Sequence, residues 1–67
     1  MHKVIDELLL NGKTILTLDD VRPLTEYNSY RIGGKVYSPI SVSGSPKWIA
    51  VEGNGGFVGK EVEFVSA

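Results

Sequence analysis

The sequence contains no cysteine and a single histidine, His2, close to the N-terminus. Disulfides are therefore excluded, and a structural zinc site is not expected because it needs about four ligands, usually Cys or His. A serine nucleophile would lack a well-placed imidazole base, and there is no thiol to replace it. The acidic residues mostly fall at turns or solvent-facing positions, where they do not converge as acid-base catalysis requires. We expect no metal, no other cofactor and no enzyme activity.

The chain also lacks an excess of basic residues and a long apolar run. Its formal net charge of −1 offers no general attraction for phosphate backbones, which supply much of the affinity of nucleic-acid binders. No run approaches the roughly 18 apolar residues that are typical of a membrane-spanning helix. Acidic side chains occupy the N-terminal stretch where a signal peptide would be apolar. We therefore expect a cytoplasmic protein.

What the chain does contain is enough apolar residues to fold, at 42% hydrophobic against 22% charged. Its 67 residues are expected to form one domain spanning 1–67. A core of this size rarely contributes more than about 3 to 5 kcal/mol, and small proteins often add disulfides, a metal or a partner subunit. Without the first two, the protein either packs unusually well alone or gains stability by association.

Glycine-containing turns divide the sequence into short segments rich in Val, Ile, Thr and aromatic residues. The turns are predicted at Asn11-Gly12, Gly33-Gly34, Gly44 and the cluster from Gly53 to Gly56. Such close spacing of turns between β-branched segments is typical of an all-β fold. We predict a small SH3-like or related barrel of five or six short antiparallel strands.

The N-terminal segment allows two interpretations. The apolar positions within residues 4–10 suit one face of a helix, which Gly12 could end. The same residues, followed by Asn11-Gly12 and another apolar run, match the strongest short-range signal for a β-hairpin. We favour the strand, and the helix is the alternative.

Matching apolar residues across the second hairpin predicts a three-residue loop. A Gly33-Gly34-Lys35 loop pairs Ile32 with Val36, because residues that face each other across antiparallel strands share one face of the sheet. This loop also places Arg31 opposite Tyr37. A two-residue loop would instead place charged residues opposite apolar ones.

The same reasoning predicts the register of the first hairpin and the core. An Asn11-Gly12-Lys13 loop places Leu8 opposite Leu16 and directs both inward. Leu10 then lies opposite Thr14, in the same inward row. Alternation along the later strands adds further predicted core positions, namely Val36, Ser38, Ile40, Val42, Ile49, Val51, Val58, Val62 and Phe64.

Two glycine-containing motifs carry little functional weight. Gly12-Lys13-Thr14 has the ending of a phosphate-binding loop, but Glu7 stands where the first glycine is required. The cluster from Gly53 to Gly59 has Val58 where a dinucleotide-binding fingerprint needs its third glycine. We interpret both as hairpin loops.

The best candidate site is aromatic. In the predicted register Tyr37 shares the outward face with Arg31, and Trp48 points away from the face of Ile49 and Val51. Large aromatic residues and arginine are favoured at protein-binding hot spots. We therefore predict a noncatalytic protein-binding module whose partner is another protein and whose contact residues are Arg31, Tyr37 and Trp48. The alternative role for Trp48 is to close one end of the core.

Two further functions stay open. Small barrels can bind single-stranded nucleic acid by combining stacking aromatics with a local basic stripe, which Arg31, Lys35 and Lys47 would form here. The protein could instead be a homo-oligomeric structural subunit whose edge strand pairs with a copy of itself. The residues alone do not decide between these partners.

Overall fold

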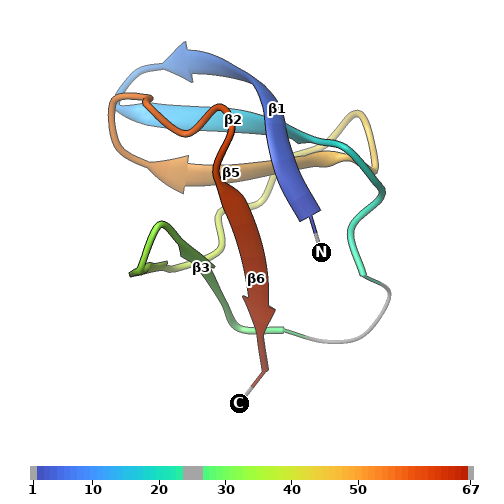
Figure 1. Ribbon diagram of the computed structural model, residues 1–67. Coiled ribbons are helices and arrows are strands. Elements are labelled where there is room, and N and C mark those ends of the chain that lie inside the picture. The colour runs from blue at the N-terminus through green and yellow to red at the C-terminus, as the bar shows by residue number, and fades with distance from the viewer. Residues whose placement is uncertain (1, 24–26, 67) are drawn as a thin grey trace.

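The computed structural model describes residues 2–23 and 27–66, and within them it contains six β-strands and no helix (Figure 1). The strands are β1 (His2–Leu10), β2 (Lys13–Leu18), β3 (Ser29–Ile32), β4 (Lys35–Tyr37), β5 (Trp48–Glu52) and β6 (Glu61–Val65). They form one open antiparallel sheet in the order β4-β3-β6-β1-β2-β5. The predicted all-β fold of short antiparallel strands is confirmed. The helical alternative for residues 4–10 is wrong, because these residues belong to β1.

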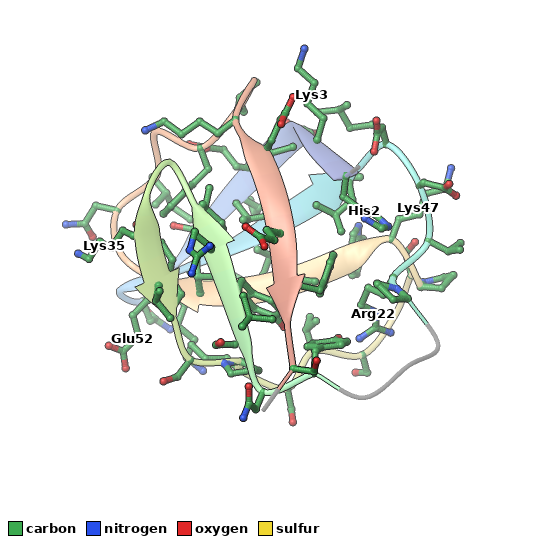
Figure 2. The ribbon with its side chains drawn as sticks, turned by 60° about the horizontal axis from the view of Figure 1, so that its bottom comes forward. His2, Lys3, Arg22, Lys35, Lys47 and Glu52 are labelled. Carbon is green, nitrogen blue, oxygen red and sulfur yellow. The ribbon has the colours of Figure 1, made fainter. Side chains whose placement is uncertain are left out.

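Strand β1 joins the two halves of this sheet. Its first residues, His2 and Lys3, pair with β6, whereas from Val4 onward it pairs with β2. The register shifts at Ile5, and a bulge of this kind bends the strand and increases its twist. As a result the half made of β3, β4 and β6 crosses over the half made of β1, β2 and β5 (Figure 2).

The core lies between these two halves. Its buried members are Val4, Leu16, Leu18, Tyr30, Ile32, Ile49, Val51, Phe57 and Val62. The predicted inward positions of Ile49, Val51 and Val62 are therefore confirmed. Val58 was expected in the core but is exposed, because it lies in the loop before β6, where strand alternation does not yet apply.

Both hairpin loops are one residue shorter than the sequence predicts. The two residues of each loop have positive φ angles, 49° at Asn11 and 80° at Gly12, then 59° at Gly33 and 83° at Gly34. Two-residue loops of this type are favoured because their twist matches the right-handed twist of the flanking strands. Asn and Gly accept this conformation readily. The twist of the loop therefore outweighs the matching of apolar residues across the strands.

The shorter first loop reverses the predicted orientation of the N-terminal leucines. Leu8 lies opposite Ile15, and Leu10 lies opposite Lys13. Leu16 and Leu18 are fully buried, so Leu8 and Leu10 are on the other face and are exposed. Their assignment to the core is wrong.

The connection from β4 to β5 follows from Pro39. Strand β4 ends at Tyr37, before this proline, which cannot donate a hydrogen bond to a neighbouring strand. The chain then returns to the sheet through one isolated bridge between Ile40 and Ala50. Ile40 and Val42 are consequently half-buried over the outside of the sheet, although the sequence predicted them in a core row.

Replacing Leu16 with Ala should lower the free energy of unfolding by about 2 to 5 kcal/mol, because it removes a fully buried side chain. Leu8→Ala is the matched control: its side chain is 57% exposed, so the loss should be about 0.5 kcal/mol or less. Urea denaturation of both variants measures the difference. Equal losses would contradict the register, in which only one of these leucines points inward.

Candidate binding surface

The shorter second loop separates two of the predicted contact residues. Arg31 lies opposite Val36, and Tyr37 lies opposite the buried Tyr30. Tyr37 thus points inward, with its ring centroid 5.6 Å from that of Phe57. The prediction that Tyr37 shares the outward face with Arg31 is wrong, because the two-residue loop shifts the register by one position.

Arg31 and Trp48 lie on the outsides of different halves of the sheet. The Arg31 guanidinium is exposed on β3 and forms an ion pair of 3.1 Å with the Glu63 carboxylate. Trp48 is half-buried on β5 and its ring packs against Gly44. It belongs to the face opposite Ile49 and outside the core cluster, which confirms its predicted direction. The structure therefore does not gather Arg31, Tyr37 and Trp48 into one patch.

The residues of the predicted basic stripe are also dispersed. Figure 2 shows Lys35 and Lys47 on opposite sides of the molecule. Lys47 instead shares its side with His2 and Arg22. The Arg22 side chain is tied down there, because its Nε donates a hydrogen bond of 3.2 Å to the Pro46 carbonyl oxygen.

The exposed apolar side chains gather on a different surface. Within the described residues, four large exposed aliphatic side chains lie on β1 alone, namely Ile5, Leu8, Leu9 and Leu10. Leu9 lies opposite the buried Thr14 and therefore belongs to the inner side of the sheet. Leu8 and its cross-strand neighbour Ile15 point away from the core, on the side of β1, β2 and β5 that we call the outer face. Contiguous apolar groups on a protein surface commonly mark an interaction site. Sequence reasoning missed this surface because it directed Leu8 and Leu10 inward.

Two shallow hollows lie next to Ile40, one on the outer face and the other between β4 and the end of β5. The first, of about 240 Å³, is lined mainly by aliphatic groups, including Leu10, Ile15 and Val42, and also by Lys13. The second, of about 290 Å³, is lined by Val36, Tyr37, Lys35, Glu52 and neighbouring residues. Ile40 lines both hollows. The outer face thus offers one mainly aliphatic recess next to Leu10 and Ile15.

Charged side chains of both signs border these hollows. Lys13 and Glu52 are cross-strand neighbours on β2 and β5. The Lys35 ammonium lies 5.5 Å from the centroid of the Tyr37 ring, a cation–π contact. Figure 2 shows Lys35 and Glu52 projecting on the same side of the molecule. An apolar centre with polar groups around it is the usual arrangement of a protein-binding surface.

The glycine-rich loop after β5 is fixed by Glu7 on the inner side of β1. The Glu7 carboxylate accepts hydrogen bonds from the backbone amides of Gly56, Phe57 and Val58, at 3.0, 2.8 and 3.3 Å. These bonds, chiefly those from Phe57 and Gly56, lower the pKa of Glu7 because they stabilise its charged form. The loop thereby holds the Phe57 ring in the core.

Two further contacts hold the glycine-rich loop close to β1 and β2. The buried Thr14 hydroxyl donates a hydrogen bond of 2.9 Å to the Gly53 carbonyl oxygen. A Cβ atom at Gly55 would lie only 2.5 Å from Glu7 Oε2, so no larger residue fits without displacing the carboxylate. The glycines of this loop therefore have a structural role. The sequence interpretation of a hairpin loop is wrong, because the loop joins β5 to β6 and these strands are not paired with each other.

Replacing Glu7 with Gln should destabilise the fold at neutral pH, because a neutral amide accepts the three backbone hydrogen bonds less well. The pKa of Glu7 is below its ordinary value of 4.5 in the folded protein. Its stabilisation is thus present above that value and is lost as the pH falls through the folded-state pKa. The difference in unfolding free energy between wild type and Glu7→Gln should shrink from about pH 7 to about pH 3. Urea denaturation of both proteins across this pH range measures the difference. A difference that does not change with pH would contradict the proposed role of the hydrogen bonds to the Glu7 carboxylate.

The described residues contain no group of three or more His, Cys, Asp or Glu side chains that could hold a metal ion. No helix in this part of the chain is long and apolar enough to cross a bilayer. A comparison with protein-family models, with curated proteins and with solved structures found no match to this chain.

Proposed function

We propose that the protein is a small noncatalytic protein-binding module, built as an SH3-like or related barrel and acting in the cytoplasm. Its partner contacts the outer face of β1, β2 and β5. The observation that carries this proposal is the pair of exposed leucines on the outer face, Leu8 and Leu10, beside the mainly aliphatic hollow. Burial of such side chains against a partner removes apolar surface from water and is favourable by roughly 25 cal/mol per Å².

The outer face is a better candidate than the residues predicted from the sequence. Arg31 is already paired with Glu63, and Tyr37 is partly buried against the core. Leu8 and Leu10 are about half exposed, at 57% and 47%. A partner therefore gains more from covering the leucines than from contacting the aromatic residues. Trp48 lies on the same outer side of the sheet and can extend the contact.

Single-stranded nucleic acid is the second candidate. The observation in its favour is that Arg22 and Lys47 lie on one side of the molecule (Figure 2), near His2, whose ring packs against Phe64. Asp19 and Asp20 are exposed close by in the chain and offset part of this charge. Binding of this kind would weaken steeply with added salt, whereas binding through the outer face would not.

The test is to crosslink the full chain in extracts of its source and to quantify the crosslinked proteins, self-crosslinks included, for wild type and two variants. Leu10→Ser should remove the specific crosslinks, since it replaces an aliphatic contact with a polar group. Val58→Ser is the matched control: Val58 is 55% exposed but lies on the glycine-rich loop. It should leave the crosslinks unchanged. Crosslinks that survive Leu10→Ser, or that both variants lose equally, would refute the proposal.

A further inference from the structure

We propose that the outer face binds a second copy of this chain, so that two outer faces meet about a two-fold axis. This inference rests on the proposed function, since it names the partner of the same surface. A two-fold contact uses one patch twice, and that patch must complement itself in shape and in charge. The outer face meets both conditions.

The shape of the outer face is self-complementary because projecting leucines lie beside a recess. Leu8 and Leu10 project from β1, and the mainly aliphatic hollow lies beside them on the same surface, between Leu10, Ile15 and Ile40. In a two-fold contact the leucines of one copy cover the hollow of the other, and the reverse contact forms at the same time.

The charges of the outer face are self-complementary as well. Lys13 on β2 and Glu52 on β5 are cross-strand neighbours at one end of the outer face, so the face carries both signs of charge there. A two-fold rotation brings the Glu52 carboxylate of one copy to the Lys13 ammonium of its partner on both sides of the contact. A border of one sign would repel its own copy, and a net charge of −1 adds little repulsion between the chains.

The free edge of β1 is less suited to a partner than its outer face. Among the described strands, β2 pairs with β1 along one side, and β6 reaches only its first residues on the other. The Glu7 backbone amide already donates a hydrogen bond of 2.9 Å to the Asp6 carboxylate. Charged side chains of this kind protect edges against strand addition. For β1, association of sheet faces is therefore favoured over the edge pairing that the sequence left as an alternative.

Binding of a second copy also compensates for the limited stability that a small core provides. A chain of this length supports one thin core, and the β1 leucines add nothing to it while they are exposed. Covering them in a dimer stabilises the folded chain by mass action. The dimer thus gives these residues a role that the single chain does not.

Sedimentation equilibrium of the full chain tests the dimer. We expect a mass of twice the 7.3 kDa chain mass at high concentration and dissociation on dilution. Leu10→Ser should weaken association by about tenfold or more, while Val58→Ser should leave it unchanged. A wild-type protein that is monomeric at every concentration would overturn the inference.

Charge reversal tests the two-fold geometry itself. Lys13→Glu and Glu52→Lys each place like charges across the contact, so each variant alone should be mainly monomeric. An equal mixture of the two variants should recover the dimer mass, because each variant supplies the charge that the other lacks. Mixing cannot repair a defect within one chain, so an absence of recovery would overturn the proposed geometry.

The outcomes also separate the dimer from the proposed function. A monomeric wild type with crosslinks to another protein that Leu10→Ser removes would overturn the dimer and support the binding surface. A monomeric wild type with no crosslink that depends on Leu10 would overturn both.

Discussion

The course of β1 is the constraint on which the rest of the structure depends. This strand pairs with β6 through His2 and Lys3 and with β2 beyond the bulge at Ile5. Because one strand belongs to both halves of the sheet, the halves fold over each other and enclose a single core. Beyond the bulge the alternation directs Glu7 toward the core side and Leu8 away from it. The outer face and the hydrogen bonds between Glu7 and the glycine-rich loop thus both depend on the course of this strand.

The sequence was sufficient for the fold class and for the inward positions within continuous strands. Ile49 and Val51 were correctly placed because β5 is regular and alternation alone determines which side chains point inward. The hairpin registers were predicted wrongly, because the matching of apolar residues and the twist of the loop favour different pairings. Two residues with positive φ are sufficient at Asn11-Gly12, and the strand twist selects this short loop. The actual register differs from the predicted one by one position, and Leu8 and Tyr37 therefore lie on the faces opposite to those expected.

The features of the candidate site that the sequence did not predict depend on contacts between distant residues. Glu7 binds the amide of Gly56, 49 positions later in the chain, and no local pattern marks an acidic side chain for this role. The hollows beside Ile40 likewise arise where the segment after Pro39 crosses β5 through one bridge. A glycine cluster signals only that a backbone turns or is closely approached. Which side chain approaches it is a property of the fold.

The central claim is that the outer face is covered by a partner, and first of all by a second copy of the chain. Methyl NMR spectra recorded over a dilution series test this claim most directly, because each methyl group reports on its own surroundings. We expect shifts that depend on concentration at Leu8, Leu10 and Ile40, and none at the exposed Val58. Spectra that do not change with concentration, or changes confined to Val58 and its loop, would contradict the account.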